Sequence, residues 1–198
     1  MKILKLGLLA ILMALVVMSC SDDSTNPDDG GGDGTTLPNS KVTIKTTVEG
    51  QEVHSKTLEL KDGKYIPSNY SVGGSYNNTT KMFSVSFTEI ASAGPSYGYQ
   101  LSSLMEKLEA GTYSYTKNDA KILVGAYTNK ELGEQPYMAN TATLVITKVQ
   151  FIGNDQAGAY YTSGTLEMDC TNEENVTPNV SVIATFESVP LSTVFLNY

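Results

Sequence analysis

From Lys41 onward, apolar and polar residues repeatedly alternate with a period of two, and this alternation limits the fold more than any other feature of the chain. In the first such stretch Val42, Ile44 and Val48 alternate with polar neighbours, and the same pattern recurs over 83–88, 112–116 and 180–187. Successive side chains of a β-strand point to opposite faces of the sheet, so each stretch predicts a strand with one buried face.

Two further stretches, Ile122–Ala126 and Leu144–Ile146, are apolar at every position, which predicts strands covered on both faces. Turn-forming residues separate the runs at Glu49-Gly50-Gln51, Lys61–Lys64, Gly73-Gly74, Lys117–Asp119 and Gly153–Asp155. Short strands punctuated in this way indicate an all-β protein with an antiparallel β-sandwich or barrel-like fold.

One segment breaks the alternation. Leu101, Leu104, Met105 and Leu108 recur at helical spacing, and Ser103–Glu106 fits a capping box. Gly111 follows as a stop signal. The pattern predicts a short helix near 101–109 that caps one end or edge of the sheet.

The first twenty residues read as a secretory signal. Lys2 and Lys5 precede the apolar run Leu6–Met18, which is too short to span a bilayer comfortably. Val17-Met18-Ser19-Cys20 resembles the bacterial lipobox, in which the Cys is lipidated and becomes the new N-terminus. The resemblance implies a signal peptide over 1–19, lipidation of Cys20, and a membrane partner reached through this anchor.

The segment 20–40 predicts a disordered tether, because it is rich in Asp, Gly and Pro and has one sizeable apolar residue, Leu37. Residues 41–198 remain as a single domain, large enough to fold without a disulfide or a metal. Ser21-Asp22-Asp23 resembles the acidic export signal of Bacteroidota lipoproteins, which implies an outer-membrane lipoprotein displayed at the cell surface.

Composition excludes several classes of function. The net charge of −8 and the absence of Arg argue against a nucleic-acid partner, which requires a basic surface. One His and two Cys, of which Cys20 is assigned to lipidation, cannot build a multi-His or Cys-rich metal centre. The sequence therefore predicts no metal and no cofactor.

Three sets of residues could carry chemistry, and each has a plainer interpretation. Cys170 shares strand parity with Leu166 and Met168, which predicts a buried thiol. His54 follows a turn without a nucleophile elbow in the chain, which predicts a surface residue. Glu167 and Asp169 lie about 6.7 Å apart on one strand face, a spacing that an inverting glycosidase could use, but that face is expected to be solvated. We expect no catalytic residue and no enzyme.

Tyrosine is the one compositional excess with a functional meaning, at 12 Tyr against 5 Phe and no Trp. Exposed Tyr rings can stack on sugars or anchor a protein partner, whereas Tyr is also a good strand former. The binding interpretation assigns the ligand site to Tyr97, Tyr99 and Tyr137.

The last third of the chain adds a resemblance. Ala142–Lys148, the Ser-Gly-Thr stretch within Tyr161–Leu166, and Val182–Glu187 resemble the strands of small Bacteroidota lipoproteins with a C-terminal β-sandwich domain. Ala184 stands where these proteins have Gly. The resemblance implies a cell-envelope location and no activity, cofactor or catalytic residue.

Together these features predict a non-catalytic surface module that binds a glycan, a peptide or an envelope protein. One alternative is a structural subunit of a fimbria-like assembly, with 192–198 as a donor strand or as a strand that closes the sheet. Another alternative is a lipocalin-like carrier of an apolar ligand, although the Gly-x-Trp signature is missing.

Overall fold

The computed structural model is all-β, as predicted, with eleven strands in the part of the chain that it describes. It describes residues 38–61, 64–66, 69–89, 97–119, 122–129, 136–153, 158–172 and 179–193. The predicted signal peptide, the tether up to residue 37 and the end of the chain from residue 194 lie outside these residues. The strands are β1 (Lys41–Val48), β2 (Gln51–Lys61), β3 (Lys64–Ile66), β4 (Tyr70–Asn77), β5 (Met82–Glu89), β6 (Tyr97–Leu104), β7 (Gly111–Thr116), β8 (Ile122–Asn129), β9 (Tyr137–Gly153), β10 (Gly158–Thr171) and β11 (Val180–Thr193).

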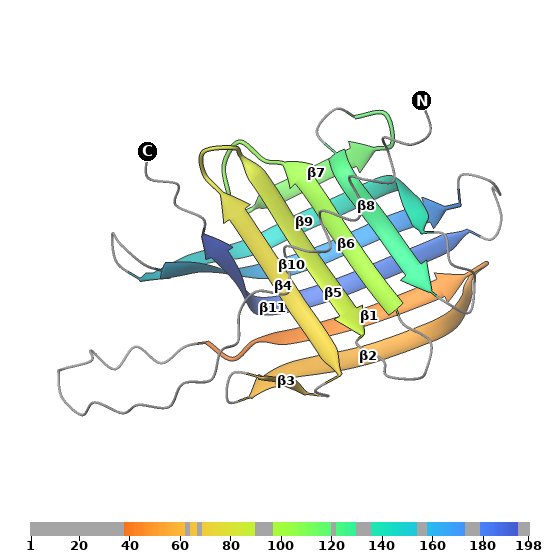
Figure 1. Cartoon of the computed structure of the whole chain (residues 1–198), viewed down its shortest axis with the longest axis horizontal. Helices are drawn as coiled ribbons and strands as arrows, with labels where there is room; N and C mark the ends of the chain where they lie inside the picture. The colour runs from red at the N-terminus through yellow and green to blue at the C-terminus, as the bar shows by residue number, and fades with distance from the viewer. Residues whose placement is uncertain are drawn as a thin grey trace, which may run out of the picture. The chain divides into compact units, whose positions relative to one another are not determined.

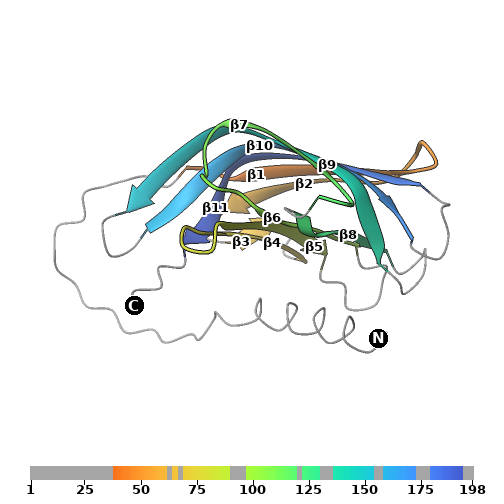
Figure 2. The same cartoon turned by 90° about the horizontal axis from the view of Figure 1, so that it is seen from above.

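The strands form one continuous sheet that curls into two facing layers (Figures 1 and 2). The wide layer contains β7, β9, β10, β11, β1 and β2, and the narrow layer, formed by β8, β6, β5 and β4, lies across its concave side. Two short seams join the layers: Ala126 and Tyr127 of β8 pair with the start of β9, and Ser75 and Tyr76 of β4 pair with the end of β11. The β4–β11 seam is parallel, and the other described pairings are antiparallel.

The core lies between the two layers and follows the alternation in the sequence. Val42 and Ile44 of β1 are buried, and their cross-strand partners in β11, Phe186 and Ala184, are buried too. On the narrow layer, the alternate residues Phe83, Val85 and Phe87 of β5 face the same core. The period-two prediction is therefore confirmed for these strands, because one face of each strand is covered by the opposite layer.

The turn between β1 and β2 also forms as predicted. Glu49 and Gly50 both have positive φ, 50° and 79°, as the two central residues of a two-residue hairpin loop require. Asn179 holds this turn from the end of β11, since its amide donates to the Glu49 carboxylate at 2.6 Å and its carbonyl accepts from the Glu49 amide at 2.9 Å.

The predicted helix near 101–109 is wrong. Residues 97–104 form β6, which pairs with β5 on one side and β8 on the other, and 105–110 form an irregular crossing to β7. The pairing of β6 with β8 shifts in register between Ser102 and Ser103. This irregularity, followed by the crossing segment, buries Leu101, Met105 and Leu108 while Leu104 is exposed, which reproduces most of a helical spacing without a helix. Among the described residues, no helix is long and apolar enough to cross a membrane.

Candidate functional site

The three Tyr side chains assigned to ligand binding are buried, so the expectation that they form an exposed surface is wrong. Tyr97, Tyr99 and Tyr137 are 9%, 2% and 3% exposed. Tyr97 and Tyr99 share the inward face of β6 with Leu101, and Tyr137 begins β9 at the seam with Tyr127. The rings of Tyr99 and Tyr127 lie 5.3 Å apart between centroids, and those of Tyr127 and Tyr137 lie 6.2 Å apart. These rings therefore form an internal aromatic row between the layers.

A polar cluster that the sequence patterns did not predict adjoins one end of this aromatic row. His54 of β2, expected at the surface, is half-buried and stacks on Tyr97 with ring centroids 4.2 Å apart. Its Nδ1 lies 2.9 Å from the Tyr99 hydroxyl, and its Nε2 lies 3.1 Å from the Tyr70 hydroxyl. The Tyr99 hydroxyl also lies 2.7 Å from Oγ1 of Thr46, which is the cross-strand partner of His54. The cluster thus joins β1 and β2 of the wide layer to β4 and β6 of the narrow layer.

The hydrogen-bond directions in this cluster follow from counting protons. The Tyr70 hydroxyl donates to the Glu89 carboxylate, which can only accept, so the Tyr70 oxygen accepts from His54 Nε2–H. A neutral imidazole has one N–H, so Nδ1 of His54 accepts from the Tyr99 hydroxyl. The Tyr99 oxygen then accepts from the Thr46 hydroxyl. All five groups form one directed chain from Thr46 to Glu89.

The surroundings of the cluster favour the neutral forms of His54, Tyr70 and Tyr99 over their charged forms. Burial lowers the pKa of His54 and the charge of Lys56 lowers it further, while the Glu89 carboxylate opposes the shift. Burial and Glu89 raise the pKa of Tyr70 to about 12, and burial raises the pKa of Tyr99. The Lys56 ammonium lies 5.9 Å from the centre of the Tyr70 ring. Because phenols occupy both nitrogens of His54, neither nitrogen faces a Ser or Cys nucleophile.

The other candidate residues occupy the positions expected of them. Cys170 is fully buried on the inward face of β10, and burial raises the pKa of its thiol to about 12, which keeps it protonated. Glu167 and Asp169 are exposed on the opposite face of β10, where Thr141 donates to the Asp169 carboxylate at 3.3 Å. The part of the chain described here has no group of three or more His, Cys, Asp or Glu that could hold a metal ion.

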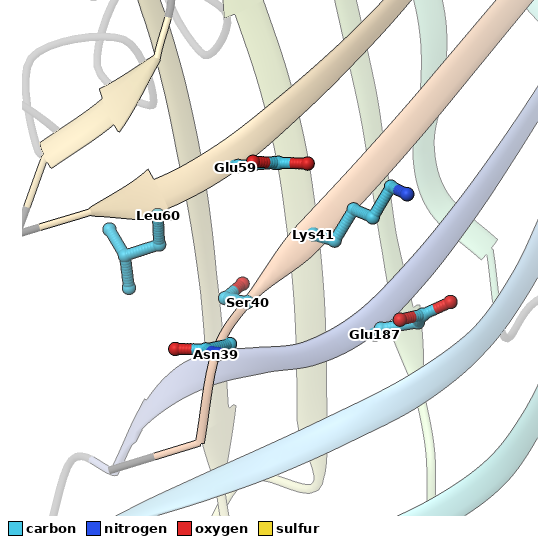
Figure 3. A pocket seen from close by; sticks show the side chains of 6 residues that line it. All are labelled: Asn39, Ser40, Lys41, Glu59, Leu60 and Glu187. Carbon is cyan, nitrogen blue, oxygen red and sulfur yellow. The ribbon is translucent and has the colours of Figure 1, made fainter.

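A hollow of about 260 Å³ lies beside the start of β1 (Figure 3). Lys41 lies between two acidic cross-strand partners there, Glu59 of β2 and Glu187 of β11, and Asn39, Ser40 and Leu60 complete the lining. The three charged side chains are exposed on the outer side of the wide layer. Water solvates such a row well, and its mixed charges do not select a ligand.

The outer part of the β9–β10 hairpin is a second surface of interest. We call residues 147–153 of β9 and 158–163 of β10 the arm; Figure 2 shows it extending past the narrow layer. Phe151 is 41% exposed, and it is the one exposed aromatic side chain among the residues whose burial the structure describes, which do not include Tyr65. Its ring lies 5.1 Å from that of its cross-strand partner Tyr160, which contacts buried Tyr76 edge-on at 6.3 Å.

The arm also has an open edge. β7 pairs with β9 only over residues 141–146, and β8 pairs only with Tyr137 and Met138. No described strand therefore lies beside the edge of β9 from Thr147 to Gly153. Such an edge presents backbone N–H and C=O groups to any extended chain of compatible sequence.

Comparisons with known proteins add no relationship: no protein-family model matches the chain, and searches of curated proteins and of solved structures find no match either.

Proposed function

We propose that this protein is a lipid-anchored component of the bacterial cell envelope, displayed at the outer-membrane surface, and that it acts by binding a partner. The head of the sequence carries the proposal: a short apolar run ends in Ser19-Cys20, and an acidic, Gly-rich tether follows it. The fold supports this reading, because β1 begins at Lys41, directly after the proposed tether, and buries Val42 and Ile44.

Replacing Cys20 by Ala tests the anchor. The full chain, expressed in a bacterium with lipoprotein processing, is expected to incorporate labelled fatty acid and to sediment with membranes. Cys20→Ala is expected to lose at least about 90% of both signals, because two or three acyl chains give lasting attachment and their loss leaves none. Cys170→Ala is the matched control, since it removes the other, buried thiol.

Two results would contradict the proposal. Equal labelling of Cys20→Ala and the unmodified sequence would exclude lipidation at this residue. Protection of the folded part from protease added to intact cells would exclude surface display and leave an anchor that faces the periplasm.

A second candidate function, a structural subunit of a surface assembly, is favoured by the arm. Its open edge and exposed Phe151 suit strand addition, in which an extended segment joins a sheet through backbone hydrogen bonds while pockets accept alternate side chains. A glycan partner has less support, because the Tyr side chains proposed to stack on sugar are buried.

Phe151→Lys tests the assembly function. A charge on the open edge is expected to disfavour strand addition, as it does at natural sheet edges. By sedimentation velocity in detergent, self-association of the full chain is expected to weaken by about tenfold, which is 1.4 kcal/mol. Ile183→Lys is the matched control, because Ile183 is 40% exposed but lies on β11, away from this edge. A monomeric wild type, or equal weakening by both variants, would rule out self-assembly through the arm.

A further inference from the structure

His54 lies where the edge strand β2 contacts the narrow layer. β2 pairs with β1 along residues 51–59, and no described strand pairs with its other side over residues 51–58. From Gln51 to Thr57, His54 and Lys56 are the residues that are not exposed. The next inward anchor is Leu58, which is fully buried. Two side chains of this half of β2 reach the narrow layer: Lys56, whose ammonium lies 5.9 Å from the centre of the Tyr70 ring, and His54. His54 makes the hydrogen bonds, to Tyr70 and to Tyr99.

The hydrogen-bond directions described above are those of the neutral imidazole. Nδ1 of His54 accepts the proton of the Tyr99 hydroxyl, so a proton added to Nδ1 meets another donor. To accept from the imidazolium, the Tyr99 hydroxyl must turn its proton toward Oγ1 of Thr46, 2.7 Å away. Thr46 is fully buried and would then have to find a new acceptor for its own proton. A buried donor without an acceptor costs roughly 1–3 kcal/mol.

The groups around the ring do not offset this cost. β4 contributes the Tyr70 phenol and β6 contributes the phenols of Tyr97 and Tyr99, all of which are neutral near pH 7. β1 contributes only the Thr46 hydroxyl. Of the two charged groups that act on His54, Lys56 on β2 disfavours the imidazolium.

The other charged group is Glu89 at the end of β5. It favours the imidazolium, but its carboxylate already accepts hydrogen bonds from Tyr70 and from Asn69 Nδ2, the latter at 3.0 Å. Burial is the largest influence on the ring, and it disfavours the charged form.

We propose that His54 is an acid-sensitive clasp: the neutral ring ties the first half of β2 to the narrow layer, and protonation releases residues 51–57 from it. Release exposes the aromatic row that begins at Tyr97 and Tyr99 of β6, the two residues of that strand that His54 contacts. The clasp is independent of the anchor and of the arm, since neither involves these residues.

The direction of the pH effect follows from the lowered pKa of His54. In the folded state the ring binds a proton less readily than in the unfolded chain, where its pKa is near 6.5. The contribution of His54 to stability is therefore complete above pH 6.5 and is lost as the pH falls below that value. A surface histidine beside a carboxylate would show the opposite dependence.

Two measurements on the full chain in detergent test the clasp. His54 is the only histidine, so one imidazole resonance reports its titration without an assignment problem. Hydrogen exchange, corrected for the intrinsic effect of pH, then compares residues 51–57 with residues 164–170 of β10 at about pH 7.5 and about pH 5.5, above the usual carboxylate range. We expect a pKa below 6.5 and a loss of protection of about threefold or more, confined to β2.

Two variants separate the clasp from a passive contact. His54→Phe keeps a ring against Tyr97 but cannot titrate, so its exchange in β2 is expected to be independent of pH over this range. Ser55→Ala changes the neighbouring exposed residue and is expected to behave as the unmodified chain. A His54 pKa at or above 6.5, pH-independent exchange in the unmodified chain, or equal acid sensitivity of His54→Phe would overturn the proposal. The titration needs no variant, so it decides the question even if His54→Phe does not fold.

Discussion

Gly164→Ala is expected to prevent the chain from folding to a stable state, although it adds a single methyl group. Gly164 lies in β10 between β9 and β11, opposite Ile146 and Phe186. A Cβ at this position would overlap the carbonyl oxygen of Val145 far inside van der Waals contact and would lie 3.1 Å from Cζ of Phe186. Because the first clash is with backbone, no side-chain rotation relieves it, and β9 and β10 must separate. We expect a loss of more than about 4 kcal/mol, the range of exceptional single substitutions.

Gly73→Ala is the matched control for this prediction. Gly73 also lies within a strand, β4, but the nearest atom to its Cβ would be Oγ of Ser86 at 3.4 Å, which can rotate away. Thermal unfolding followed by circular dichroism compares the two variants. Gly73→Ala is expected to melt close to the unmodified chain, and a Gly164→Ala variant that melted with it would show that β9 and β10 do not approach as closely as the structure has them.

The strands that the sequence predicted best are those in which one face is apolar throughout. Val180, Val182, Ala184 and Phe186 are buried as the alternation requires, because side-chain parity along a strand is a local property. The alternation of inward and outward side chains also continues through β6, where the sequence was wrongly predicted to form a helix. Tyr97, Tyr99 and Leu101 alternate with Gly98 and Gln100, and this continuous alternation leads into the segment that was interpreted as a helix.

The polar cluster could be predicted only in part. His54 shares parity with Leu58, and the spacing of these two residues was a signal that His54 faces inward. Its partners Tyr70 and Tyr99 are 16 and 45 residues away and belong to the opposite layer. Which hydroxyl meets which nitrogen depends on how one layer crosses the other, and strand alternation carries no information about that crossing.

The burial of the Tyr rings is a second feature that strand alternation alone does not predict. Tyr is amphipathic, so neither composition nor parity decides whether its ring lines a binding surface or fills the core. At Tyr99 the decision depends on the hydrogen-bond partners Thr46 and His54, which satisfy the hydroxyl inside the fold. A Tyr-rich sequence therefore predicts a binding surface only where such internal partners are absent.

Phe87→Ala is expected to lower the free energy of unfolding by about 3–5 kcal/mol, the usual cost of removing a fully buried Phe. Phe87 is 1% exposed and lies on β5, at the centre of the narrow layer between β4 and β6. Its cross-strand partner in β6 is Tyr99, so a cavity here would also loosen the aromatic row and the His54 cluster. Folded domains are stable by only about 5–15 kcal/mol, so this loss is expected to bring the chain close to unfolding at physiological temperature.

Phe151→Ala makes the same chemical change at the tip of the arm. Comparing the two variants therefore separates the effect of burial from the effect of the residue type. Phe151 is largely exposed, so its truncation forfeits little burial and is expected to cost less than about 1 kcal/mol. Urea unfolding of both variants, analysed with a common slope, measures the difference directly. Equal losses of unfolding free energy in the two variants would mean that the two layers do not enclose a core at Phe87. The internal aromatic row would then not be supported by a buried side chain at this position. A large loss of stability confined to Phe87→Ala would mean that the core between the two layers stabilises the protein. The exposed part of the arm would then be dispensable for folding and available to bind a partner.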